Sequence, residues 1–201
     1  MWQIILAAGW PIWPLIIASV VALAIIGERF FALRSNIVSP NNLLPEVQTW
    51  LSKGGITKDT VQRLEQHSPL GQIFAAALNN SNGSREITKE AVEEAGRAVA
   101  HHLEKYLSTL GTIATVAPLL GLLGTVIGMV ELFGAFTNTG HDIAQFARGI
   151  SVALYNTAAG IVVAVPAMIA YRYFRSKVDG LLVDMEQQAI KLVEVMHGER
   201  K

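Results

Sequence analysis

Two long stretches without a charged side chain constrain the fold of this chain more than any other feature. One lies between Lys105 and Met129, and the other lies between Arg148 and Arg172. Each exceeds the roughly 20 residues that a helix needs to cross a bilayer at a rise of about 1.5 Å per residue. Both contain Gly, Ala and Thr at helical spacing. On a membrane helix, such residues indicate close helix packing or a wall against a polar partner.

The distribution of charge predicts an integral membrane protein with three spans. Of the 201 residues, 51% are hydrophobic and 16% are charged, whereas about a quarter of a typical soluble domain is charged. Residues 1–27 contain no charged side chain, and we expect them to belong to a retained span, not to a cleaved signal peptide. The chain has no cysteine, so it has no thiolate metal site, and it has no basic stripe suited to nucleic acid.

Basic residues near the span ends predict the orientation, because Lys and Arg concentrate on the cytoplasmic side. Arg29, Lys105 and Arg172 mark three cytoplasmic ends, and Arg148 is the one dissenting residue. The N-terminus is therefore expected outside and the C-terminus inside. The expected segments are a first span at 1–34, a cytoplasmic helical loop at 35–104, a second span at 105–136, a periplasmic hairpin at 137–147, a third span at 148–174 and a cytoplasmic helical tail at 175–201.

Apolar periodicity predicts an all-α fold in which the second and third spans extend into a cytoplasmic helical bundle. No helix breaker separates Thr88 from the second span, so we expect one helix of about 49 residues that ends near Phe136. Short helices are expected between residues 35 and 83, with Thr57 as a cap and a break at Ser68-Pro69. The stripe before the second span is Ile87, Ala91, Ala95, Val99, Leu103, Tyr106 and Leu110. The stripe after the third span is Val178, Leu181, Met185, Ala189, Leu192 and Met196.

Small and hydroxyl residues of the second and third spans form the candidate site. Spacings of three and four residues place members of each set on one helix face. The residues assigned to a pore lining and proton pathway are Thr115, Thr125, Asn156 and Thr157. Those assigned to helix packing in the pore wall are Gly121, Gly124, Gly128, Gly149, Ala153, Gly160 and Ala164, with Pro118 and Pro166 as bends. Helix packing alone is the simpler interpretation, because a threonine hydroxyl can bond its own helix. A wall around a pore or partner is the functional one.

The middle of every predicted span contains no Asp, Glu, Lys or His. Threonine does not titrate, so a proton would have to travel on a group of a partner or on water. Glu131 follows the uncharged part of the second span, where it is either an interfacial carboxylate or part of a cation entrance. No nucleophile, phosphate-loop or metal-ligand motif appears, and we expect neither an enzyme nor a bound metal or cofactor.

These residues resemble the MotA/TolQ/ExbB proton-channel family. The resemblance rests on APLLGLLGTVIGM from Ala117, on GISVALYNTAAGIVVAVPAMIAY from Gly149, and on Gly27-Glu28-Arg29 at the end of the first span. Three spans with a large first cytoplasmic loop resemble the ExbB/TolQ branch, and the chain is ExbB-like. Val152 stands where several ExbB and TolQ members have a glutamate, so the resemblance does not identify the cargo.

The resemblance implies a homopentamer in the bacterial inner membrane, whose second and third spans surround a pore. It implies a single-span ExbD/TolR-like partner, in two copies, that supplies a protonatable aspartate, and a TonB- or TolA-like protein that receives the work. The pore-lining threonines of the family match Thr125 and Thr157. Two alternatives stay open, a self-contained secondary transporter, for which no inverted repeat is visible, and a passive membrane scaffold. The sequence does not distinguish H⁺ from Na⁺ as the driving ion.

Overall fold

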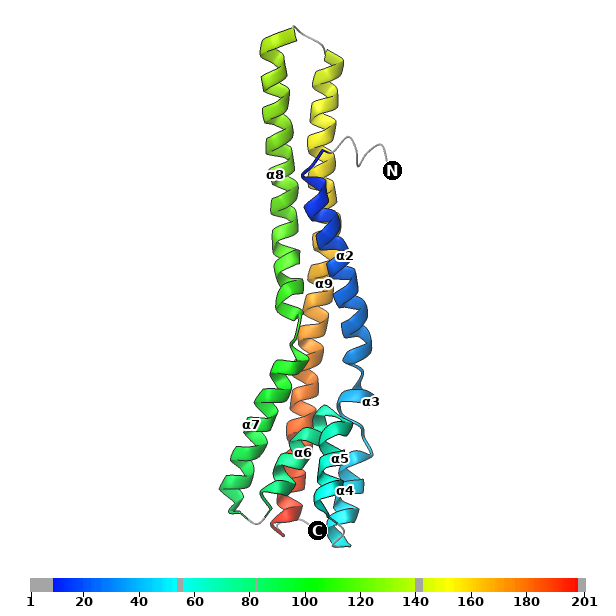
Figure 1. Ribbon diagram of the computed structural model, residues 1–201, viewed down its shortest axis with the longest axis vertical. Helices are drawn as coiled ribbons and strands as arrows, with labels where there is room; N and C mark the ends of the chain where they lie inside the picture. The colour runs from blue at the N-terminus through cyan, green and yellow to red at the C-terminus, as the bar shows by residue number, and fades with distance from the viewer. Residues whose placement is uncertain (1–8, 54–55, 82, 140–142, 199–201) are drawn as a thin grey trace. The chain divides into compact units, whose positions relative to one another are not determined.

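The computed structural model describes residues 9–53, 56–81, 83–139 and 143–198. All regular secondary structure in these ranges is helical, which confirms the all-α prediction. Three segments are long and apolar enough to cross a membrane, as predicted: Ile12–Ala32, Arg85–Gly134 and Gly149–Met196. The helices are α2 (Ile12–Ala32), α3 (Ser35–Val38), α4 (Leu43–Ser52), α5 (Lys58–His67), α6 (Pro69–Asn79), α7 (Arg85–Leu103), α8 (Leu107–Thr139) and α9 (Ile143–Met196) (Figure 1).

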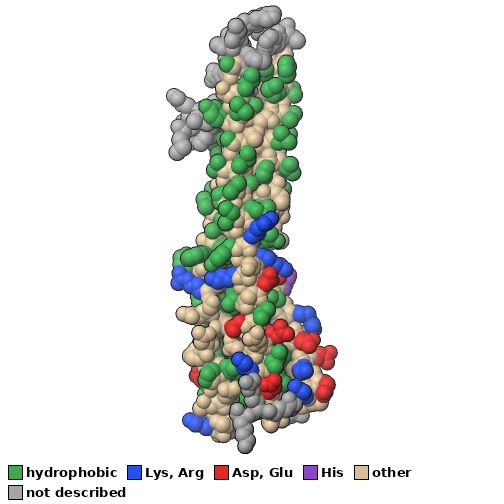
Figure 2. Space-filling view, turned by 180° about the vertical axis from the view of Figure 1, so that it is seen from behind, with side chains coloured by type: hydrophobic (Ala, Val, Ile, Leu, Met, Phe, Trp, Pro, Cys, Tyr) green, Lys and Arg blue, Asp and Glu red, His purple; other side chains and the backbone are tan. Residues whose placement is uncertain are grey.

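The chain divides into two compact units. The first comprises Met1–Glu28 and Tyr106–Tyr173, and the second comprises Arg29–Lys105 and Phe174–Lys201. The first unit therefore holds most of α2, all of α8 and the first part of α9. The second unit holds the other helices, together with the last residues of α2 and the end of α9. On the face seen in Figure 2, hydrophobic side chains are spread over the first unit, whereas charged side chains gather on the second.

The first unit packs a leucine of α2 against small residues of α8 and α9. A buried cluster takes one residue from each helix, namely Leu15, Ala117 and Ala164. Large apolar side chains point outward instead, for example Val130 of α8, which is 67% exposed, and Val162 of α9, which is 70% exposed. Because a water-facing surface of this kind would be unfavourable, it suits lipid or a neighbouring subunit.

Side-chain caps start three helices of the second unit, α5, α6 and α7, whereas α3 and α4 have no such cap. The Ser68 hydroxyl accepts the amide of Gly71 at 3.1 Å, and Pro69 occupies the first position of α6, where a missing N–H costs little. Thr57 and Ser84 cap α5 and α7 in the same way. The predicted cap at Thr57 and the predicted break at Ser68-Pro69 are therefore confirmed.

The core of the second unit forms around α6 and the end of α9. Phe74 of α6 is fully buried. The stripe predicted on α9 is confirmed, because its first five members are buried and its last, Met196, is half-buried. On α7 the predicted stripe is only partly right. Val99 is buried, but Ile87 is 51% exposed. Thr88 is fully buried in its place, and its hydroxyl donates to a carbonyl of the preceding loop at 3.0 Å.

The predicted continuous helix from Thr88 to Phe136 is wrong. α7 ends at Leu103, residues 104–106 form a turn, and α8 begins at Leu107. Tyr106 adopts a φ of 64°, a left-handed conformation that costs a residue other than glycine about 1–2 kcal/mol. Since no glycine or proline lies at the turn, the local sequence does not explain the break.

Two contacts from distant segments of the second unit reach the end of α7. The buried Arg29 donates from Nη1 to the Leu103 carbonyl at 3.1 Å. The Glu104 carboxylate lies 2.9 Å from Nη1 of Arg175. In a continuous helix, the Leu103 carbonyl would accept the amide of residue 107. The Arg29 bond therefore replaces one helical hydrogen bond that the local sequence predicts, and the Glu104 ion pair holds the neighbouring side chain.

A three-residue polar network ties the segment after α3 to α9 in the second unit. The buried Ser39 donates from Oγ to Oδ2 of Asp184 at 2.7 Å. Gln188 donates from Nε2 to Ser39 Oγ at 2.9 Å and to Asp184 Oδ2 at 3.0 Å. The Ser39 hydroxyl is thus both donor and acceptor, and it connects two segments that are far apart in the sequence.

Removing this hydroxyl is expected to destabilise the protein. Ser39→Ala loses two hydrogen bonds at a buried position, which costs about 1–3 kcal/mol, and should lower the melting temperature of the purified protein by several degrees. Ser52→Ala is the matched control, because the Ser52 hydroxyl is exposed and bonds a carbonyl of its own helix at 2.9 Å. Equal melting temperatures for the two variants would contradict a stabilising role for the network.

Candidate functional site

Helices α8 and α9 touch backbone to backbone at two glycines. A Cβ atom added to Gly121 would lie 2.8 Å from the Asn156 carbonyl oxygen. One added to Gly160 would lie 2.7 Å from the Ala117 carbonyl oxygen. Both distances are shorter than a carbon–oxygen contact allows, and a helix backbone cannot move aside as a flexible side chain can. Only glycine therefore fits at either position.

Small residues continue this contact toward the end of α8 and the start of α9, the two helices that form the α8–α9 hairpin. A Cβ atom on Gly128 would meet the Cβ of the buried Ala153 at 3.6 Å, an ordinary van der Waals distance. Farther along, Gly149 lies directly against the side chain of Leu132, and a Cβ atom there would overlap with it. Glycine spacing on both helices thus places the two backbones close together over several turns.

The threonines of the candidate pore lining have different surroundings. Thr125 is half-buried and donates to the carbonyl of Leu122 at 2.6 Å. Thr115 is exposed and donates to carbonyls of its own helix at 3.2 and 3.0 Å. These bonds are those expected of hydroxyls in a helix. Thr157 is half-buried, and its Cα would lie 3.2 Å from a Cβ atom on Gly121. The hydroxyl-bearing residue of α9 thus stands beside the glycine contact.

Asn156 lies inside the hairpin, with only 1% of its surface exposed. Its Nδ2 donates to the Val152 carbonyl at 3.4 Å. Its Cβ would lie 2.6 Å from a Cβ atom on Gly124, so the absent side chain of that glycine makes room for the asparagine. Asn156 and Thr157 are adjacent in the sequence, but their environments differ. The side-chain amide of Asn156 is buried between α8 and α9, whereas Thr157 is half-buried.

The two prolines lie within their helices, because α8 continues past Pro118 and α9 continues past Pro166. Pro118 is half-buried and Pro166 is exposed. Glu131 belongs to α8, but its side chain lies outside the described part of the structure. The same holds for residues 140–142 of the predicted periplasmic hairpin. Their assignments stay predictions.

Two side chains in the hairpin contact were missed by the sequence analysis. Leu132 fills the space at Gly149, and the ring of Tyr171 would lie 3.3 Å from a Cβ atom on Gly111. The contact of Gly111 with Tyr171 could have been suspected from the sequence, because Gly111 precedes the other glycines of α8 on the same uncharged stretch. A large side chain opposite a glycine is a pairing that spacing along one helix does not reveal.

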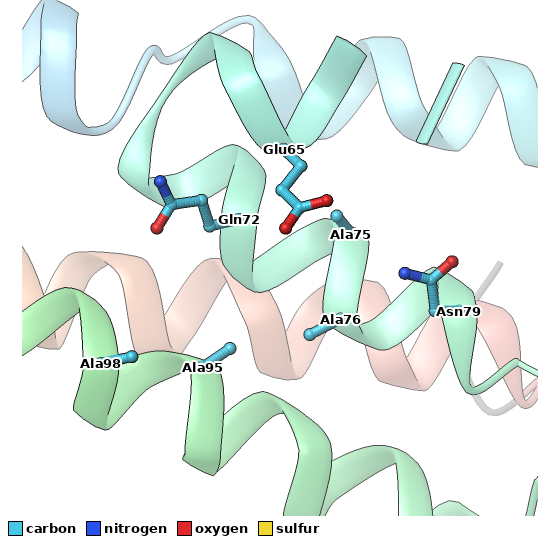
Figure 3. Close-up of a pocket in the computed structure, with 7 residues that line it drawn as sticks. All are labelled: Glu65, Gln72, Ala75, Ala76, Asn79, Ala95 and Ala98. Carbon is cyan, nitrogen blue, oxygen red and sulfur yellow. The ribbon is translucent and has the colours of Figure 1, made fainter. Parts of the chain in front are cut away.

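The second unit contains a cavity of about 280 Å³ between α5, α6 and α7. Alanines from α6 and α7 line it together with the polar side chains of Glu65, Gln72 and Asn79 (Figure 3). Within the described ranges, the structure brings together no group of three His, Asp or Glu side chains that would hold a metal ion.

The long helices and their glycine contact agree with the comparison with known families. A model of the MotA/TolQ/ExbB proton channel family matches residues 65–187, which is more than half of the chain. The chain belongs to this family. The match contains all of α8 and most of α9, and therefore the whole of the hairpin contact described above.

Relatives of this family are named as ExbB proteins of biopolymer transport. A putative ExbB homolog of Methanothermobacter thermautotrophicus is 32% identical over 153 residues, which cover 76% of this chain and 54% of the relative. ExbB-like 3 of Synechocystis sp. is 30% identical over 168 residues, covering 81% of this chain and 79% of that protein. ExbB1 of Vibrio cholerae is 28% identical over 181 residues, which cover 87% of this chain and 78% of that protein. The chain thus spans about half the length of the first relative and over three quarters of the other two.

Proposed function

We propose that this chain is an ExbB-type subunit of a proton-driven complex in the bacterial inner membrane. In this proposal it couples the proton-motive force, through an ExbD/TolR-like partner, to a TonB- or TolA-like protein that acts in outer-membrane transport or integrity. The observation that carries the proposal is the glycine contact of α8 and α9, beside which Thr157 lies half-buried. Membership of the family and the ExbB names of the relatives support it.

The partner supplies the group that takes up and releases the proton. The sequence has no charged or histidine side chain at residues 10–27, 106–130 or 149–171, so the spans themselves offer no proton carrier. Threonine hydroxyls can both donate and accept hydrogen bonds, which lets them hold water or a carboxyl group of a partner helix. Thr115, Thr125 and Thr157 are assigned this role, and Asn156 supports it from within the hairpin. Glu131 is assigned to the entrance of the pathway.

The complex is a homopentamer around two copies of the partner helix. Exposed apolar side chains on α8 and α9, among them Val130 and Val162, provide surface for lipid and for neighbouring copies. The N-terminus is periplasmic, and the second unit with the C-terminus is cytoplasmic. The charge asymmetry at the span ends supports this orientation.

Native mass spectrometry of the complex tests the proposal. The tagged chain is purified in mild detergent from cells that also produce its natural neighbours, and the mass is measured. Five copies with two copies of a small single-span protein are expected. A monomer or dimer without such a protein would contradict the proposal and favour a self-contained transporter. Oligomers without a partner that conduct no protons in vesicles would favour a passive scaffold.

A further inference from the structure

The turn between α7 and α8 interrupts a sequence that favours a helix. Residues 102–107 read HLEKYL, and the nearest glycines are Gly96 and Gly111. Leu, Glu and Lys are strong helix formers. Tyr106 nevertheless has a φ of 64°, and among the described residues it is the one non-glycine with a positive φ. The broken conformation is therefore unfavourable locally and requires support from other parts of the protein.

Arg29 occupies the acceptor that a continuous helix would use. Its guanidinium is buried, and Nη1 donates to the Leu103 carbonyl at 3.1 Å. In an α-helix that ran through the turn, the same carbonyl would accept the amide of Leu107. In the broken form that carbonyl has no helical donor, and the buried Arg29 guanidinium supplies a donor in its place. Arg29 thus favours the broken form directly.

A second contact acts on the next residue. The Glu104 carboxylate lies 2.9 Å from Nη1 of Arg175, and that guanidinium also faces Asp179 at 3.7 Å through Nε. Arg175 belongs to the part of α9 in the second unit, so this ion pair fixes the end of α7 against another helix. Arg29 and Arg175 together hold two consecutive residues at the point where α7 stops.

We propose that residues 104–106 form a two-state joint, which is broken while Arg29 and Arg175 hold the end of α7 and becomes continuous helix when they release it. The broken form is the one in the structure. In the continuous form, the carbonyls of residues 103–105 would accept the amides of residues 107–109 in a helix without a turn. This inference concerns the conformation of the chain and does not depend on the ion or partner of the proposed complex.

Amide hydrogen exchange distinguishes the two states, because the exchange rate at the joint should fall, not rise, when the supporting contacts are removed. The first amides of α8 have no acceptor within their own helix, whereas in a continuous helix they would bond to residues 103–105. Exchange of a peptide covering residues 104–110 should therefore slow when the joint straightens. A contact that merely stabilised this region would have the opposite effect, because its removal would make exchange faster.

The experiment uses the full-length chain in mild detergent, together with the membrane proteins that co-purify with it. Arg29→Met keeps the length of the side chain and removes the donor, and it should slow exchange in this peptide. Arg34→Met is the matched control, because Arg34 is exposed and its guanidinium lies 4.8 Å from the centre of the Phe31 ring. The control should leave the peptide unchanged. Faster or unchanged exchange in Arg29→Met would overturn the proposal.

A second pair of variants tests the joint without touching Arg29. Tyr106→Ala favours the continuous helix, whereas Tyr106→Gly favours the broken form, because glycine adopts a positive φ freely and is a poor helix former. Exchange of the same peptide should be about fivefold slower in the alanine variant than in the glycine variant, as the helix propensities of the two residues imply. Should Arg29→Met fail to fold, this pair decides alone. Equal exchange in the two would overturn the proposal.

Discussion

Gly160→Leu is expected to disrupt the packing of α8 against α9 and with it the proposed complex, and Gly160→Ala is expected to weaken both. Even the single methyl group of alanine would lie 2.7 Å from the Ala117 carbonyl oxygen and 3.1 Å from the Gly121 Cα. Both are backbone atoms, so α8 and α9 must separate to admit the methyl group. Overpacking of this kind costs about 1–3 kcal/mol for a small group and more for a large one. Leucine adds three further carbon atoms and leaves the two helices no close contact.

The measurements are the melting temperature of the purified protein and the amount of oligomer by native mass spectrometry. Gly128→Ala is the matched control on α8, because its methyl group would meet Ala153 at 3.6 Å, an ordinary distance. Alanine gains about 1 kcal/mol over glycine in a helix, so the control should melt at the same or a higher temperature. A lower melting temperature for Gly160→Ala together with an equal or higher one for Gly128→Ala would locate the close contact at Gly160. A lower melting temperature for Gly128→Ala than for Gly160→Ala would contradict it.

Features that depend on neighbouring residues along the chain could be predicted from the sequence. The three membrane-spanning segments follow from length and hydropathy, and the cap at Thr57 follows from a hydroxyl before a helical segment. The buried stripe on α9 follows from its spacing, because one face of a regular helix is fixed by a period of about 3.6 residues. The glycines of α8 and α9 could be selected in the same way, although their individual contacts could not.

Features that depend on distant residues could not be predicted. The break before α8 is held by Arg29, which is 74 residues from its acceptor Leu103, and no local pattern indicates that bond. The burial of Asn156 has a similar cause. Adjacent residues on a helix point about 100° apart, so Asn156 and Thr157 cannot both face the same surroundings. The space that Gly124 leaves on the other helix determines which of the two is buried.

Thr157→Val is expected to reduce proton-driven activity by about tenfold or more at normal expression. Valine has nearly the shape of threonine and lacks the hydroxyl, so the helix contact at Gly121 is preserved while a hydrogen-bonding group is lost. A hydrogen bond to a charged group contributes about 1.5–3 kcal/mol, and each 1.4 kcal/mol corresponds to about a factor of ten. Thr157→Ser restores the hydroxyl and should retain most of the activity. The measurement is proton flux into vesicles that contain the complex with its partner.

The control for this variant is Thr112→Val, which removes a hydroxyl from the other helix of the hairpin. Thr112 is exposed and bonds the Ser108 carbonyl of its own helix at 2.9 Å, so its loss should leave proton flux unchanged. Native mass spectrometry of Thr157→Val must show the oligomer and partner of the unmodified protein, because only then does lost flux report on the hydroxyl. Full flux in Thr157→Val would exclude a role for this hydroxyl in proton transfer. The glycine contact would then have a structural role only, because Gly160→Ala can separate α8 from α9 whether or not Thr157 takes part in proton transfer.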